Sequence, residues 1–164
     1  MAIQIKTLDQ LKVMRRAGLV VAEIHQAIRT AIKPGMTTSA LDAVAAACIK
    51  RNGATSNFLN YHGFPAVICA SINDEIVHGI PNDRPIEDGD VVSIDFGAII
   101  EGWHGDAAFS TIAGTKNSAD QKLLDTCEES MWRGIAAGKA GAKLTDISFA
   151  IEDYNRSQGK YGIL

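Results

Sequence analysis

The apolar residues of the chain change their spacing twice, from helical to strand-like and back. From Thr7, which begins a capping box with Gln10, to Ile28 they recur at nearly helical intervals. A Pro-Gly dipeptide at residues 34–35 ends this segment, and an alanine-rich second helix is predicted over residues 39–51. The chain is therefore expected to begin with two helices.

Between residues 54 and 112 the pattern is typical of strands. Short β-branched runs alternate there with turn residues. The runs are AVICASI (66–72), EIVHGI (75–80) and DVVSIDFGAII (90–100). Helical patterning returns from Ser118 onward. The order helix, helix, strands, helix, helix favours an α+β fold over a doubly wound parallel sheet.

The two helical regions resemble each other, which indicates an internal repeat. Residues 33–53 align with residues 139–159 at a constant offset of 106. The matched glycine pairs are Gly35 with Gly141 and Gly53 with Gly159. The helix before each copy also begins with a predicted capping box, at Thr7 and at Ser118. Two amphipathic helices can resemble each other by chance, but the glycines and the capping boxes favour a repeat.

If the repeat is real, a second set of strands should follow its second copy. The first copy is followed by the strand-like residues 54–112, whereas only KYGIL follows the second. We therefore interpret the chain as one catalytic-type domain that is truncated. Residues 1–117 would form its first half, and residues 118–164 would begin the second.

Two aspartates lie inside the segment VVSIDFGAIIEGWHGDAAFSTI (91–112). If residues 101–102 form a two-residue hairpin turn, Gly97 pairs with Asp106, and Asp95 shares their face because side chains alternate. The two carboxylates are then diagonal neighbours, roughly 7–8 Å apart by backbone. They repel each other unless a cation intervenes, and a pair of divalent ions would satisfy them. A turn-capping aspartate beside a solvent-exposed one is the alternative.

The four histidines have different predicted environments. His62 and His78 each precede a glycine at a turn, where a histidine can donate a hydrogen bond to a substrate. A turn histidine in water is the alternative for both. His104 shares the strand face of Asp106 and is expected to be solvated. His25 is expected at the surface or boundary of the first helix.

Composition excludes several classes of protein. The chain has 164 residues, 46% hydrophobic and 21% charged, which suits one soluble domain with a sizeable core. A net charge of -3 and a pI near 5.8 indicate neither a nucleic-acid nor a membrane surface. The three cysteines form no CxxC motif, which predicts reduced thiols. We find neither a signal-peptide pattern nor an apolar span in this sequence, so we expect a cytoplasmic protein.

Two segments carry a resemblance to a known family. They are NYHGFPAVICASINDEIVHGIP (60–81) and GDVVSIDFGAIIEGWHGDAAFS (89–110). Together they resemble the type I methionine aminopeptidases, bacterial enzymes that remove initiator methionine, and the resemblance extends over the whole chain. It implies an α+β pita-bread fold, in which two pseudo-symmetric halves surround a dinuclear metal centre. That symmetry would account for the repeat.

The resemblance also implies roles for individual residues. Asp95 and Asp106 would bind two divalent metal ions (Co, Mn, Fe or Zn), with Asp106 bridging both. His78 would be catalytic and would bind the substrate near its scissile peptide bond. The residues that would line or border the pocket for the methionine side chain are Tyr61, His62, Phe64 and Cys69.

The implied substrates are peptides and nascent proteins that begin with methionine and continue with a small residue, and the ribosome is an implied partner. The family completes its site with one His and two Glu ligands and a further His, all from the second half. We therefore expect an incomplete ligand set and an inactive 164-residue chain. Two alternatives stay open: a non-catalytic pita-bread module that binds peptides or proteins, and a related proline-specific peptidase.

Overall fold

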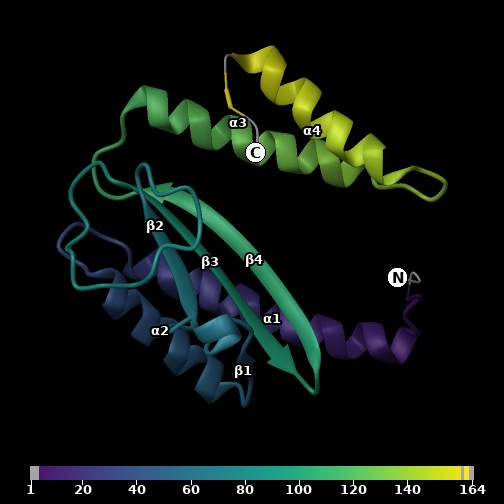
Figure 1. The fold of residues 1–164 in the computed structure, drawn as a ribbon, viewed down its shortest axis with the longest axis horizontal. Coiled ribbons are helices and arrows are strands. Elements are labelled where there is room, and N and C mark those ends of the chain that lie inside the picture. The colour runs from purple at the N-terminus through teal and green to yellow at the C-terminus, as the bar shows by residue number, and fades with distance from the viewer. Residues whose placement is uncertain (1–3, 160, 163–164) are drawn as a thin grey trace. The chain divides into compact units, whose positions relative to one another are not determined.

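The computed structural model describes residues 4–159, 161 and 162. Its elements follow the predicted order of helix, helix, strands, helix, helix, which confirms the α+β class (Figure 1). They are α1 (Leu8–Ala31), α2 (Thr38–Arg51), β1 (Thr55–Ser56), η1 (Tyr61–Gly63), β2 (Ile68–Ile72), β3 (Val91–Ile100), β4 (Trp103–Ile112), α3 (Ser118–Ala137) and α4 (Leu144–Gln158). The chain divides into two compact units, residues 1–115 and 116–164.

Strand β3 is the centre of the sheet in the first unit. It pairs antiparallel with β4 over its whole length, and with β2 and β1 over successive parts. Gly97 faces Asp106 and Asp95 faces Ala108, as the predicted hairpin requires. Its turn residues Glu101 and Gly102 have φ angles of 49° and 78°, a left-handed pair typical of a type I′ turn.

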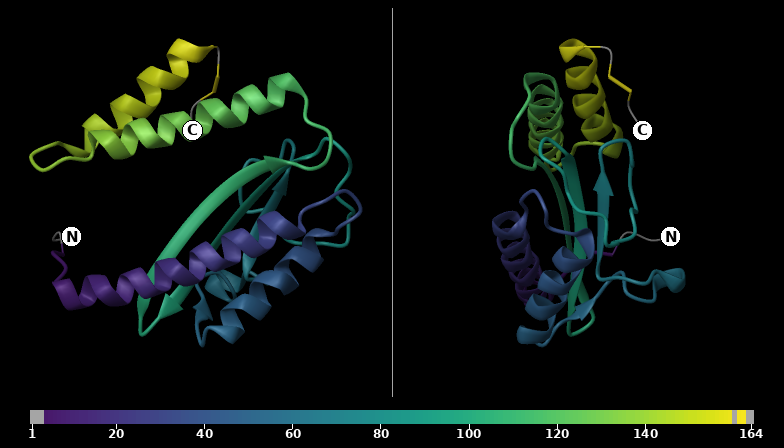
Figure 2. Two further views of the ribbon diagram at one scale, coloured as in Figure 1. Left: turned by 180° about the vertical axis from the view of Figure 1, so that it is seen from behind. Right: turned by 90° about the vertical axis from the view of Figure 1, so that its left-hand side faces the viewer.

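Helices α1 and α2 cover the same face of this sheet (Figure 2). Alternate residues of β3 are buried beneath them with no exposed surface: Val92, Ile94, Phe96 and Ala98. The residues between them, such as Ser93 and Asp95, therefore point to the opposite face. Strand β2 is fixed at its start by Asp42 of α2, whose Oδ1 accepts the N–H groups of Val67 and Ile68 at 2.8 and 3.0 Å.

The second unit is a pair of packed helices, α3 and α4. A Cβ on Gly134 would lie 2.8 Å from the Ile151 side chain, so the helices approach closely at this glycine. Helix α4 begins 106 residues after α2, at the offset of the predicted repeat. Gly35 and Gly141 share a left-handed conformation, with φ of 87° and 88°. The likeness therefore extends from the sequence to the backbone at the start of each copy.

Two local predictions are wrong. Residues 75–80, predicted as a strand, are irregular, because His78 has a φ of 60° that no strand residue adopts. The predicted capping box at Ser118 lies one residue too late. Asn117 is the N-cap, and its side chain accepts the N–H of Asp120 instead. By contrast, the capping box of Thr7 and Gln10 is confirmed.

His25 of α1 lies at the boundary of the core, as predicted. Its ring stacks on Phe109 at a centroid distance of 4.4 Å and meets Phe96 edge-on at 6.0 Å. The Nε2 atom accepts a hydrogen bond from Arg29 Nε at 3.1 Å. Burial, and secondarily the charge of Arg29, lowers the pKa of His25 below its usual 6.5. Among the described residues, no helix is both long and apolar enough to cross a membrane.

A pair of glycine substitutions tests how closely α1 lies on β4. A Cβ on Gly105 would lie 2.8 Å from the backbone of Ala17 and Gly18, so we expect Gly105→Ala to lower the free energy of unfolding by about 1–3 kcal/mol. Gly18→Ala is the matched control, because a Cβ there meets nothing within 4 Å and alanine favours the helix by up to about 1 kcal/mol. Urea unfolding of both variants provides the measurement, and equal effects would contradict the close approach.

The stability of the chain is expected to fall on mild acidification because of His25. As the pH drops below about 6.5, the unfolded chain takes up a proton at this residue before the folded chain does. The free energy of unfolding therefore decreases until the pH has also passed the lower pKa of the folded state. Urea titrations between about pH 7.5 and about pH 5 should show a smaller decrease in the free energy of unfolding for His25→Gln than for the wild type. Identical pH profiles would exclude His25 as the cause.

Candidate active site

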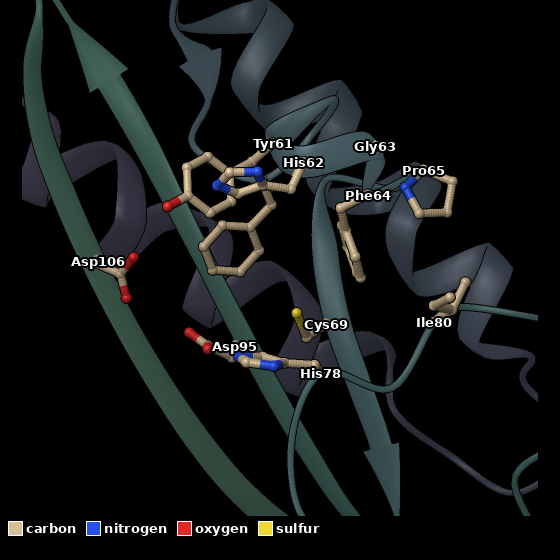
Figure 3. A pocket seen from close by; sticks show the side chains of 11 residues that line it. Tyr61, His62, Gly63, Phe64, Pro65, Cys69, His78, Ile80, Asp95 and Asp106 are labelled. Atoms are coloured by element: carbon tan, nitrogen blue, oxygen red, sulfur yellow. The ribbon is translucent and has the colours of Figure 1, made fainter.

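A cavity of about 550 Å³ brings together all the residues that the sequence singled out as a site (Figure 3). It is lined by Phe58, Tyr61, His62, Gly63, Phe64, Pro65, Cys69, His78, Ile80, Asp95 and Asp106. Strands β2, β3 and β4 contribute Cys69, Asp95 and Asp106, and the other lining residues come from η1 with its flanking segments and from the loop between β2 and β3. The predicted site residues are thus neighbours in space.

The two aspartates occupy the cavity side of the sheet as diagonal neighbours. Asp95 is half-buried and Asp106 is exposed, and Gly97, which lies on the same face, contributes no side chain of its own. Burial raises the pKa of Asp95, and the negative charge of Asp106 raises it further. The charge of His78 and the backbone N–H of Phe96 act in the opposite direction. The pair therefore creates a local excess of negative charge.

A divalent cation suits this pair, because its charge would remove the repulsion and carboxylate oxygens are common metal ligands. The Asp106 carboxylate extends over Gly97, because a Cβ there would lie 2.9 Å from Asp106 Oδ2 and 2.3 Å from Asn57 Nδ2. Within the described part of the chain, no group of three or more His, Cys, Asp or Glu side chains is placed to hold a metal ion. Asp95 and Asp106 thus fit as two ligands of a larger set.

His78 is held beside Asp95 by the residue that follows it (Figure 3). The Gly79 N–H donates to Ser71 Oγ at 3.1 Å, and the Gly79 carbonyl accepts the N–H of Ala70 at 2.9 Å. A Cβ on Gly79 would lie 2.2 Å from the Ala70 oxygen, so this contact requires glycine. The left-handed φ of His78 is a strained conformation of the kind that concentrates at functional sites.

Aromatic rings form the opposite wall of the cavity. Phe58 and Phe64 meet edge to face at 6.4 Å, and the Tyr61 and His62 rings lie 4.4 Å apart. His62 itself has a left-handed φ of 47°, which sets the sharp turn of η1. This wall is apolar on the side of Phe58 and Phe64 and more polar where Tyr61 and His62 are exposed to solvent.

Cys69 of β2 lies opposite Asp95 in the register. Burial raises the pKa of its thiol to about 11, with smaller contributions from the charges of Asp95 and Asp106. The thiol is therefore protonated near neutral pH and behaves as a small apolar group rather than as a nucleophile. His104 is exposed and does not line the cavity, as expected for a solvated residue.

Four lining residues were not predicted: Phe58, Gly63, Pro65 and Ile80. Each lies within three residues of a predicted site residue, so their apolar character next to Tyr61, Phe64 and His78 was the available signal. Sequence alone does not show which neighbours of a turn point into the same cavity.

Comparisons with known proteins agree with this geometry. Residues 12–163 match metallopeptidase family M24. Methionine aminopeptidase 1 of Bacillus subtilis is 45% identical over 149 residues, which is 91% of this chain and 60% of that protein. Methionine aminopeptidase 1 of Mycobacterium tuberculosis is 46% identical over 159 residues, 96% of this chain and 60% of that protein.

Solved structures show the same likeness. The crystal structure of methionine aminopeptidase from Rickettsia prowazekii superposes with a TM-score of 0.92 at 38% identity, covering 95% of this chain and 63% of that one. A prolidase from Pyrococcus furiosus, with a TM-score of 0.85 and 22% identity, covers 94% of this chain and 44% of that one and shows the fold alone. These matches confirm the predicted pita-bread fold.

The chain spans about 60% of the length of the curated relatives that it matches. The family match covers residues 12–163, and the paired aspartates, the histidine loop and the aromatic wall all lie inside it. The chain therefore belongs to metallopeptidase family M24, in which it is similar to the type I methionine aminopeptidases.

Proposed function

We propose that this chain forms the substrate pocket and part of the metal centre of a metal-dependent aminopeptidase that removes amino-terminal methionine from peptides and nascent proteins. The observation that supports this most is the convergence of Asp95, Asp106 and His78 on one cavity with an aromatic wall. The similarity to methionine aminopeptidases supplies the substrate class. The cytoplasm and the ribosome are the corresponding location and partner.

Asp95 and Asp106 are the proposed ligands for two divalent ions, with Asp106 bridging them. When bound, such ions supply an activated water near neutral pH, and the oxygen ligands present here do not discriminate among Co, Mn, Fe and Zn. Both carboxylates line the same cavity, and Gly97 on the same strand face contributes no side chain of its own. The chain itself thus provides the negative charge that recruits the cations.

The cavity wall is proposed to bind the methionine side chain. Phe58, Phe64 and the neutral thiol of Cys69 give it an apolar surface, and a thioether sulfur makes favourable contacts with aromatic rings. An unbranched side chain of the first substrate residue can lie between the aromatic rings and the carboxylates. The free amino group of that residue is then near the negative charge of the carboxylates. Binding at this end would restrict cleavage to the first residue of the peptide.

His78 is proposed to donate a hydrogen bond to the carbonyl oxygen of the scissile peptide bond. Negative charge develops on that oxygen during attack, and a donor already fixed in place stabilises it. The two hydrogen bonds of Gly79 to β2 fix the loop that carries His78, so the donor does not have to be ordered by the substrate.

Neither alternative from the sequence gains support. A non-catalytic binding module has no need of two carboxylates on a cavity wall. The likeness to prolidase, at 22% identity, shows the fold and not the substrate. We therefore keep methionine-specific cleavage as the proposed activity.

Metal binding tests the role of the aspartates. We expect Mn²⁺ to stabilise the 164-residue chain against unfolding, by about 2.7 kcal/mol at a free concentration of about 100 times its Kd. Asp106→Asn should abolish this stabilisation because it removes a proposed bridging carboxylate. Asp153→Asn, at an exposed position on α4, is the matched control and should leave it unchanged. Thermal unfolding with and without EDTA provides the measurement, and equal stabilisation of both variants would refute the assignment.

Peptide binding tests the role of His78. We expect a Met-Ala-Ser peptide to bind in the presence of Mn²⁺, with His78→Ala weakening the affinity by about 10-fold, as for the loss of one hydrogen bond. His104→Ala should have the wild-type affinity, because His104 does not line the cavity. Isothermal titration calorimetry measures both.

The same mixtures can be assayed for chelator-sensitive release of methionine. We expect none from this chain by itself, because its described residues supply two metal-binding carboxylates only. Absence of peptide binding to the metal-loaded wild type would contradict the proposed function.

A further inference from the structure

Asn57, which the sequence did not single out, connects the two strands that carry the aspartates. Its backbone N–H donates to the carbonyl of Gly97 at 3.3 Å, and its Nδ2 donates to the carbonyl of Gly105 at 3.4 Å. Gly97 is the register partner of Asp106, and Gly105 directly precedes it. The carboxamide of Asn57 therefore lies across β3 and β4 next to Asp106.

The absence of a side chain at Gly97 makes this arrangement possible. A Cβ on Gly97 would lie 2.3 Å from Asn57 Nδ2 and 2.9 Å from Asp106 Oδ2. The amide nitrogen and the carboxylate oxygen thus flank the same point above the strand. No other polar side chain is among the three atoms nearest to that point.

The carboxamide also has unused capacity for hydrogen bonds. Its nitrogen carries two hydrogens, of which the Gly105 carbonyl accepts one over a long distance. Its Oδ1 is buried and has no partner among the described residues. A buried polar atom left unpaired destabilises a fold by about 1–3 kcal/mol. The placement of Asn57 is therefore explained by the site more readily than by stability.

We propose that Asn57 is a positioning residue for Asp106. The two groups do not share a hydrogen bond in the structure, but the second Nδ2 hydrogen of Asn57 is placed to donate to the Asp106 carboxylate, because both groups flank one point above Gly97. Such a bond would hold the carboxylate in the orientation needed for a metal ligand. This inference rests on the proposed function for its purpose, although the hydrogen bond itself would not require a metal. Carboxylate ligands are generally held by such hydrogen bonds, and losing one reduces metal affinity by about 10–100-fold.

NMR of the metal-free chain tests the contact directly. One of the two side-chain amide protons of Asn57 should be shifted downfield and exchange slowly with solvent, and Asp106→Ala should remove both properties. Asp95→Ala is the control, because Asp95 does not flank the point above Gly97. An Asn57 amide that responds equally to both substitutions, or to neither, would overturn the proposal.

Mn²⁺ titration followed by EPR tests the consequence. We expect Asn57→Leu, which keeps the volume but loses the donor, and Asn57→Ala to weaken Mn²⁺ binding by about 10-fold or more. Ser56→Ala is the matched control, because its Oγ caps the N–H groups of Phe58 and Leu59 and so supports the same loop without facing Asp106. It should lower stability and leave the Mn²⁺ affinity unchanged.

The two measurements separate the two hypotheses. If Asn57→Leu binds Mn²⁺ as the wild type does, the positioning role is wrong while the metal site stands. If the wild type itself does not bind Mn²⁺, the proposed function fails, and the NMR result alone decides whether Asn57 orders Asp106.

Discussion

The pairing register between β3 and β4 is the constraint on which the whole site depends. Side chains alternate along a strand, so a slip of one residue would exchange the two faces of β3. Phe96 would then lose its place beneath the helices, and Asp95 would be forced into the apolar core. The free energy of burying Phe96 and the other apolar residues on its face of β3 therefore also keeps the two carboxylates on the face that lines the cavity. The left-handed turn at Glu101 and Gly102 selects the same register independently.

Glycines at three positions determine how closely other segments approach the sheet. Gly105 lets α1 lie against β4, Gly79 lets the His78 loop lie against β2, and Gly97 leaves room for a carboxamide beside Asp106. In each case a Cβ would overlap another group at less than 3.0 Å. On both the core face and the cavity face of the sheet, glycines therefore allow other segments to pack directly against the backbone.

Sequence reasoning was accurate where local physics decides the structure. The alternation of side chains and a two-residue turn determine the register of the hairpin. The diagonal placement of Asp95 and Asp106 could therefore be predicted from the sequence alone. It failed for residues 75–80, where β-branched residues suggested a strand. There the hydrogen bonds of Gly79 to β2 impose an irregular path, and a distant partner of this kind leaves no periodic signal. Asn57 and Phe58 were missed for the same reason, because tertiary contacts decide which way their loop faces.

The charges at the site bear on metal binding and on catalysis in different ways. Burial and the charge of Asp106 raise the pKa of Asp95, so a proton and a cation compete for the same pair of carboxylates. A bound cation would remove the repulsion between the two carboxylates, which is the physical basis of the proposed metal site. Activating a water is more demanding, since it requires a coordination geometry fixed by several ligands. In the proposed function, the hairpin would help to determine where the metal and the substrate bind, whereas the rate of reaction would depend on the complete set of ligands.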